Sequence, residues 1–237
     1  ATEDERFLEH AGVDFYGIGR ALGKMGKGGG ASTITQQLAK LIFTLEERQR
    51  KARFKAEGKT IQTQSNGKLR RLSEKVKENI IAIRLEERYT KEEIITMYLN
   101  QFDFLYNAVG IENAAKVYFN KKPIDLTKSE AAMLIGMCKN PGLYNPHGYQ
   151  VKNYRSIVAS RYKLAQENVT NQQILDARVS DSSRAISRRN QVLFQWKRSS
   201  IKENAALNNL MSQAEYDSLK SVPVVTDYQV VDHKEGL

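Results

Sequence analysis

The hydrophobic positions of the chain follow a helical repeat in most segments. Apolar residues recur at intervals of three and four, the spacing that places them on one side of an α-helix. The pattern predicts helices over 5–13, from Ser32 or Thr33 through Ile42, and over 74–88, 91–100, 129–137, 154–168 and 182–195. The helix over 74–88 is expected to turn Val76, Ile80, Ile81 and Ile83 toward a core. We therefore expect a mainly α-helical fold.

Two segments depart from this pattern. Residues 46–73 are polar, rich in basic side chains and weakly periodic, and such a segment buries little surface to offset its ordering entropy. We expect it to be mobile and to become ordered on binding. Near the end, VPVVTDYQVV alternates in a strand-like way. We expect one domain over 1–198 and a short strand-like linker over 199–237.

Composition and charge narrow the possible partners. Hydrophobic residues make up 41% and charged residues 27% of the 237 residues, as in an ordinary folded domain. The net charge of +10 favours anionic partners, such as nucleic acid, an acidic membrane surface or a phosphorylated substrate. Cys138 is the single cysteine, which excludes an internal disulfide. No apolar run approaches the roughly 20 residues that a membrane-spanning helix needs.

Two motifs near the beginning could carry chemistry. In EDERFLEHAGVD, Glu3 and Asp4 could simply favour the start of a helix, because carboxylates are stabilised there, or one of them could be catalytic. In GGGASTITQQLAK, a glycine loop leads into a helix start rich in Ser and Thr. This arrangement is similar to a phosphate cradle, although it lacks the Gly-Lys-Ser/Thr of a P-loop. A single polar stripe is expected to contain Ser32, Gln36 and Lys40, at i, i+4 and i+8.

Two further motifs contain several charged residues. EKVKE, followed by KEEIITMYLN, is typical of a solvated helix face but also gathers carboxylates and lysines. In RRNQVL, Arg188 and Arg189 could bind a phosphate or a carboxylate through forked hydrogen bonds. Each motif alone also fits a purely structural role.

Taken in this order, the motifs resemble those of glycosyltransferase family 51. This family contains the peptidoglycan polymerase domain of class A penicillin-binding proteins and the monofunctional transglycosylases. The resemblance runs from Glu3 to about Leu193, and its most specific parts are EDERFLEHAGVD, GGGASTITQQLAK and KEEIITMYLN. It implies a lysozyme-like, two-lobed helical domain with a cleft between the lobes. It also implies polymerisation of lipid II into β-1,4-linked strands, with inversion and release of undecaprenyl diphosphate.

The resemblance assigns roles by matching positions. Glu3 matches the general base, Asp4 a supporting residue, and Glu78 the carboxylate near the leaving diphosphate. Ser32, Gln36, Gln37 and Lys40 match the donor-binding helix. Arg70, Lys75, Lys77, Arg188 and Arg189 match positions around the diphosphate or the groove, and Arg20 one on the acceptor side. The chain departs from the family at Glu74, where an Arg is usual, and at Leu41, where an Asn is common.

The resemblance also implies partners and a location. The partners are lipid II, the nascent glycan strand, an anionic membrane surface and phosphoglycolipid inhibitors of the moenomycin type. No metal-ligand cluster is visible in the sequence, and a divalent cation, Mg or Mn, could accompany the donor diphosphate as in family members. We expect the domain on the outer face of the cytoplasmic membrane, with an anchoring helix before it and a transpeptidase domain after it.

Two other functions stay open. A glycan-cleaving enzyme of lysozyme-like shape would use Glu3 as an acid, but it would have no diphosphate for the basic STITQQLAK helix to hold. A basic, non-enzymatic nucleic-acid-binding domain would explain the net charge, but no motif of that kind is recognisable and nucleic acid is not expected as a partner.

Overall fold

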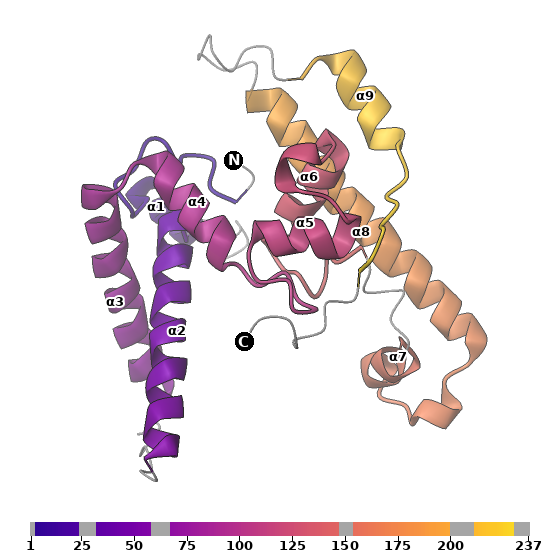
Figure 1. Cartoon of the computed structure of the whole chain (residues 1–237), viewed down its shortest axis with the longest axis horizontal. Helices are drawn as coiled ribbons and strands as arrows, with labels where there is room; N and C mark the ends of the chain where they lie inside the picture. Colours follow the sequence, from indigo (N-terminus) through magenta and orange to yellow (C-terminus); the bar gives the residue numbers. More distant parts are fainter. Residues whose placement is uncertain (1–2, 24–31, 58–66, 147–153, 200–210, 230–237) are drawn as a thin grey trace. The chain divides into compact units, whose positions relative to one another are not determined.

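The computed structural model describes residues 3–23, 32–57, 67–146, 154–199 and 211–229. The chain forms two compact units, Glu3–Phe102 and Asp103–Leu237, and each is described by itself. Helices dominate both units, and the described residues contain no β-strand (Figure 1). The prediction of a mainly α-helical fold is confirmed.

The described residues of the first unit form four helices. They are α1 (Phe15–Gly23), α2 (Ile34–Ala56), α3 (Gly67–Arg88) and α4 (Lys91–Gln101). Helices α2 and α3 lie side by side and antiparallel, and α4 packs against the first part of α2 (Figure 1). Thr33 begins α2 with a reciprocal capping box to Gln36, and Thr90 begins α4 in the same way with Glu93.

The second unit is built around the contact between α6 and α8. Its elements are α5 (Ile111–Phe119), η1 (Pro123–Asp125), α6 (Lys128–Met137), α7 (Tyr154–Tyr162), η3 (Gln166–Asn168), α8 (Asn171–Ser199) and α9 (Gln213–Ser221). Met133, Leu134 and Met137 of α6 are buried, as is Cys138 directly after it. The helices approach closely at Gly136, where an added Cβ would lie 3.2 Å from Arg188 Cγ. The predicted buried helix over 129–137 is therefore confirmed.

The predicted helix over 5–13 is wrong. These residues form successive turns, in which the backbone N–H groups of Phe7 and Glu9 donate to the carbonyls of Asp4 and Arg6. Gly12 has a φ of +91°, which a right-handed helix cannot accommodate. We call residues 3–14 the opening segment.

Several predicted boundaries are also corrected. The polar segment 46–73 is largely helical where it is described, since α2 continues to Ala56 and α3 begins at Gly67; residues 58–66 lie outside the described part. Helix α7 ends at Tyr162, before Lys163 with its φ of 54°, and α8 begins already at Asn171. Residues 222–229 form no strand with any other described part of the chain, although Gln229 N donates to Val117 O at 2.8 Å.

The prediction of which side of α3 is buried was also wrong. Val76, Ile80 and Ile83 are 49%, 48% and 41% exposed, while Ala82 is fully buried. Ile81 is partly buried. The side of α3 toward α2 instead carries Ala82 and polar residues, and Glu86 and Asn79 there accept hydrogen bonds from Thr35 and Gln36 of α2.

Candidate active site at the start of helix α2

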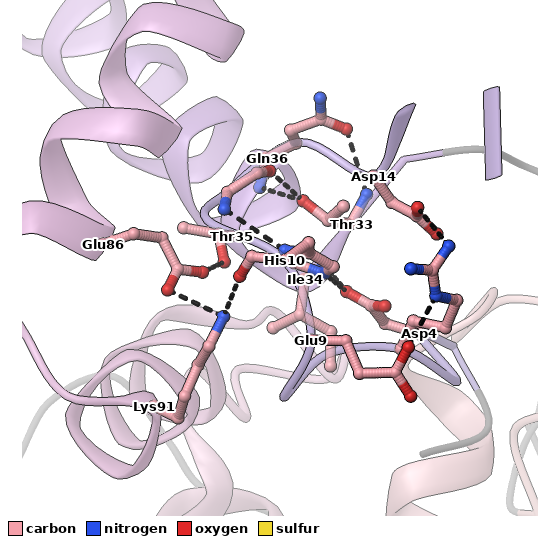
Figure 2. A network of polar contacts seen from close by, with 12 residues as sticks. Asp4, Glu9, His10, Asp14, Thr33, Ile34, Thr35, Gln36, Glu86 and Lys91 are labelled. Carbon is pink, nitrogen blue, oxygen red and sulfur yellow. Dashed lines mark hydrogen bonds and ion pairs between the residues drawn. The ribbon is translucent and has the colours of Figure 1, made fainter. Parts of the chain in front are cut away.

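The carboxylate of Asp4 lies at the beginning of α2 and is almost completely buried. Its Oδ2 accepts a hydrogen bond from the backbone N–H of Ile34, the first residue of the helix, at 3.0 Å. A negative charge is stabilised there by the helix dipole and by an N–H that has no partner within the helix. Asp4 thus attaches the opening segment to α2, and its supporting role in catalysis stays a prediction (Figure 2).

His10 completes the surroundings of Asp4. Its Nε2 lies 2.9 Å from Asp4 Oδ2, and its Nδ1 accepts from the backbone N–H of Gly12 at 3.2 Å. These two bonds together assign the proton to Nε2 and the lone pair to Nδ1. The structure thus makes His10 a hydrogen-bonding partner of Asp4.

Gly12 brings the opening segment into direct contact with two helices. Its carbonyl accepts from Thr33 Oγ1 at 2.6 Å, so the residue that caps α2 also holds the segment. A Cβ at Gly12 would lie 2.8 Å from the backbone carbon and oxygen of Ala82 in α3. The glycine is therefore required both by its backbone angle and by the close approach to α3.

A second attachment involves Lys91 at the start of α4. Lys91 Nζ donates to the carbonyl of His10 at 2.6 Å and pairs with Glu86 Oε2 at 2.7 Å (Figure 2). The other oxygen of Glu86 accepts from Thr35 Oγ1 in the first turn of α2 at 2.5 Å. From the sequence, this charged region also fitted a solvated helix face, and the KEEIITMYLN motif was the signal that pointed to Lys91.

Three predicted site residues come together beside the same helix start. Lys75 Nζ donates to Ser32 Oγ and pairs with Glu78 Oε2, both at 2.9 Å. The side chain of Lys75 is 44% exposed and that of Glu78 is 12% exposed. The arrangement places an accessible cation next to a carboxylate and a hydroxyl, which is a suitable environment for an anionic ligand.

The predicted polar stripe of α2 is only partly formed. Ser32 precedes the capping residue and is therefore outside the helix, while Lys40 is exposed. Gln36 is 2% exposed, and its amide bonds to Thr33 N at 3.0 Å and to Asn79 Oδ1 at 2.8 Å. Its predicted contact with the donor stays a prediction, and in this structure its side chain joins α2 to α3.

The remaining predicted residues of the first unit are more scattered. Glu3 is partly exposed and directly precedes Asp4. Gln37 accepts from the Tyr98 hydroxyl at 3.1 Å. Lys77 Nζ lies 5.3 Å from the centre of the Phe43 ring. Arg20 belongs to α1 and Arg70 to α3, but their side chains lie outside the described part.

The two predicted arginines of the second unit are both buried. Arg189 donates to Ser129 Oγ at 3.0 Å, to Val222 O at 2.6 Å and to Lys220 O at 3.0 Å. Burial lowers the pKa of its guanidinium, which nevertheless stays charged. This geometry gives Arg189 a structural task, and its proposed contact with diphosphate remains untested.

Arg188 differs from Arg189 in facing a hollow. It donates to Gly136 O at 3.4 Å and to Gln191 Oε1 at 3.0 Å, and its guanidinium lies 5.7 Å from the Tyr144 ring centre. It lines a polar cavity of about 280 Å³ together with Tyr144, Arg184, Gln191 and three serines. Burial lowers its pKa as well.

The described residues do not fit a resident metal ion. No group of three or more His, Cys, Asp or Glu side chains there could hold one. Glu78, the carboxylate assigned to the diphosphate, already accepts from Lys75. A divalent cation, Mg or Mn, that accompanies a donor diphosphate stays a prediction.

Among the described helices, none has the length and apolar character required to cross a membrane.

Residues 1–168 match the Transglycosylase family. Penicillin-binding protein 1F of Bacillus subtilis (strain 168) is 40% identical over 157 residues, which cover 65% of this chain and 19% of that protein. Penicillin-binding proteins 1A of Escherichia coli (strain K12) and Neisseria flavescens are 41% and 39% identical over 150 residues, which cover 62% of this chain and 15% and 16% of those proteins.

The chain thus spans less than a fifth of each of these relatives. The family match is broader than any one of these alignments, since it covers well over half of the 237 residues. It also includes the opening segment and the start of α2, where the motifs EDERFLEHAGVD and GGGASTITQQLAK lie. The resemblance drawn from the motifs is confirmed, and the chain belongs to the Transglycosylase family.

Proposed function

We propose that the chain is a peptidoglycan glycosyltransferase domain that polymerises lipid II into β-1,4-linked glycan strands and releases undecaprenyl diphosphate. The family assignment supports the reaction class. The observation that carries the proposal is the attachment of the opening segment to α2 through Asp4, next to the group formed by Ser32, Lys75 and Glu78. Carboxylates and an accessible cation are thereby gathered at one helix start.

The proposed reaction is a single displacement with inversion. Glu3 takes the proton of the acceptor hydroxyl as its oxygen attacks the anomeric carbon of the donor. The bond between that carbon and the diphosphate breaks, and its electron pair leaves with the diphosphate. Lys75 stabilises the charge that develops there, and Glu78 keeps the ammonium group in place at 2.9 Å.

The same proposal places the domain at the outer face of the cytoplasmic membrane, because the lipid tail of the donor stays in the bilayer. Leu72, Val76, Ile80 and Ile83 support this location: they are all exposed and lie at i, i+4, i+8 and i+11 of α3, on one side of the helix. A net charge of +10 would add attraction to anionic lipids.

Replacement of Glu3 by Gln tests the proposed base. The variant keeps the shape of the side chain but cannot accept the proton, and loss of a general base typically lowers the rate about 100- to 10,000-fold. Glycan synthesis from lipid II should fall by that factor, while a phosphoglycolipid of the moenomycin type should still bind. Glu5→Gln is the matched control, because Glu5 is exposed two residues away and should be dispensable. Near-normal synthesis by Glu3→Gln would remove Glu3 from the mechanism.

A further inference from the structure

Lys91 contacts the opening segment at two points. Its ammonium donates to the carbonyl of His10 at 2.6 Å and lies 4.6 Å from the centre of the Phe7 ring. Lys91 is the first residue of α4, and its side chain is only 21% exposed. Both the backbone and a buried ring of the segment are therefore fixed by one side chain.

Glu86 connects this lysine to α2. Its side chain is 7% exposed, with one oxygen on Lys91 and the other on the hydroxyl of Thr35. Thr35 lies one residue after Ile34, whose N–H holds Asp4. The opening segment is consequently tied to the start of α2 directly, through Asp4 and Gly12, and also indirectly, through Lys91 and Glu86.

We propose that Lys91, held by Glu86, is a positioning residue for the general base Glu3. This inference rests on the proposed function. The opening segment has no regular secondary structure, so side-chain bonds rather than a backbone ladder determine where Glu3 lies. Glu3 is adjacent to Asp4, and the bonds of Asp4 and Gly12 to the start of α2 would by themselves leave the segment free to rotate about the line that joins them. The bond from Lys91 to the His10 carbonyl removes that freedom.

The expected consequence is on the chemical step rather than on substrate binding. A base must reach the acceptor hydroxyl within hydrogen-bonding distance, and a displacement of about 1 Å can cost on the order of 100-fold in rate. Lys91 acts on the segment from the side of Phe7 and His10, whereas Ser32 and Lys75, the residues assigned to the donor, bond to each other. Donor affinity should therefore change little.

The test compares variants of the 237-residue chain in glycan synthesis from lipid II. Lys91→Met keeps the length of the side chain and removes its donors, Glu86→Gln weakens the ion pair, and the double variant avoids a buried unpaired carboxylate. Lys121→Met is the matched control, since Lys121 forms a comparable pair with Glu130 at 2.8 Å in the second unit. Thermal unfolding of each variant identifies the temperature range in which it is folded, and kinetics are measured there.

We expect kcat of Lys91→Met and of the double variant to fall about 10- to 100-fold, with KM within about threefold of the wild-type value. Lys91→Arg, which retains donors and charge, should recover part of the loss, and Lys121→Met should match the wild type. The inference is overturned if the folded double variant has wild-type kcat, or if only KM changes. A wild-type chain that makes no glycan would instead refute the proposed function.

Discussion

Helices α3 and α6 carry similar aliphatic residues at helical spacing but use them in opposite ways. Met133 and Leu134 of α6 are buried against the rest of the second unit, whereas Val76 and Ile80 of α3 are about half exposed. The side of α3 that faces its own unit is small or polar instead. Periodicity thus identifies the apolar side of a helix but does not tell whether the protein's own residues pack against that side.

The two units also differ in what surrounds a closely packed glycine. At Gly12 the neighbour is the backbone of Ala82 in α3, 2.8 Å from an added Cβ. At Gly136 in α6 the neighbour is Arg188 Cγ, at 3.2 Å. A helix backbone cannot yield, while a side chain can rotate slightly, so the two sites should respond unequally to the same substitution.

The largest loss of stability is expected from Leu134→Ala in α6. Leu134 is fully buried, and removal of a buried leucine side chain leaves a cavity that costs about 2–5 kcal/mol of unfolding free energy. Denaturant unfolding of the second unit would measure the loss. A change below about 1 kcal/mol would show that α6 is not the rigid centre of this unit.

The next effect in size is expected from Gly12→Ala. Overpacking against Ala82 costs roughly 1–3 kcal/mol, and the left-handed backbone adds about 1 kcal/mol. Because the opening segment would also move, glycan synthesis should fall with stability. Gly136→Ala is the matched comparison and should cost clearly less, as the contact is with a side chain. Equal losses at the two glycines would contradict the distinction between rigid and yielding neighbours.

The smallest effect on stability is expected from Ile80→Ser on the exposed side of α3. Surface substitutions usually stay within about 0.5 kcal/mol. Binding to vesicles containing anionic phospholipid should nevertheless weaken if this side meets a membrane, because serine loses apolar contact with the lipid. Ile124→Ser is the control, since Ile124 is 88% exposed in η1 of the second unit. Similar vesicle binding by both variants would exclude a particular role for α3.

Short helices with a clear apolar periodicity were predictable from the sequence. The buried helix over 129–137 and the helix over 91–100 were located well because their apolar residues contact other helices of the same unit. The polar ends of α2 and α3 were missed because neither has a clear apolar pattern there. Each end is instead stabilised by packing against the other helix. Tertiary packing commonly overrides such weak local signals.

The opening segment illustrates why part of the site was not predictable. An acidic beginning followed by Phe7 and Leu8 suits a helix, but Asp4 bonds to the N–H of Ile34, 30 residues further along the chain. The lysine that fixes His10 lies 81 residues away. No local pattern encodes such partners. The family motifs predicted which residues belong to the site, and the structure shows which of them are in contact.

Arg189 has a consequence for the way the second unit opens. Its guanidinium, which comes from α8, donates to the carbonyls of Lys220 and Val222 at the end of α9. Detachment of α9 would leave a buried charge without these acceptors, so local fraying of this end is costly. The two consecutive helices should therefore behave as a single cooperative element, and a force applied to the chain after α9 would act on the interior of the unit rather than on its surface.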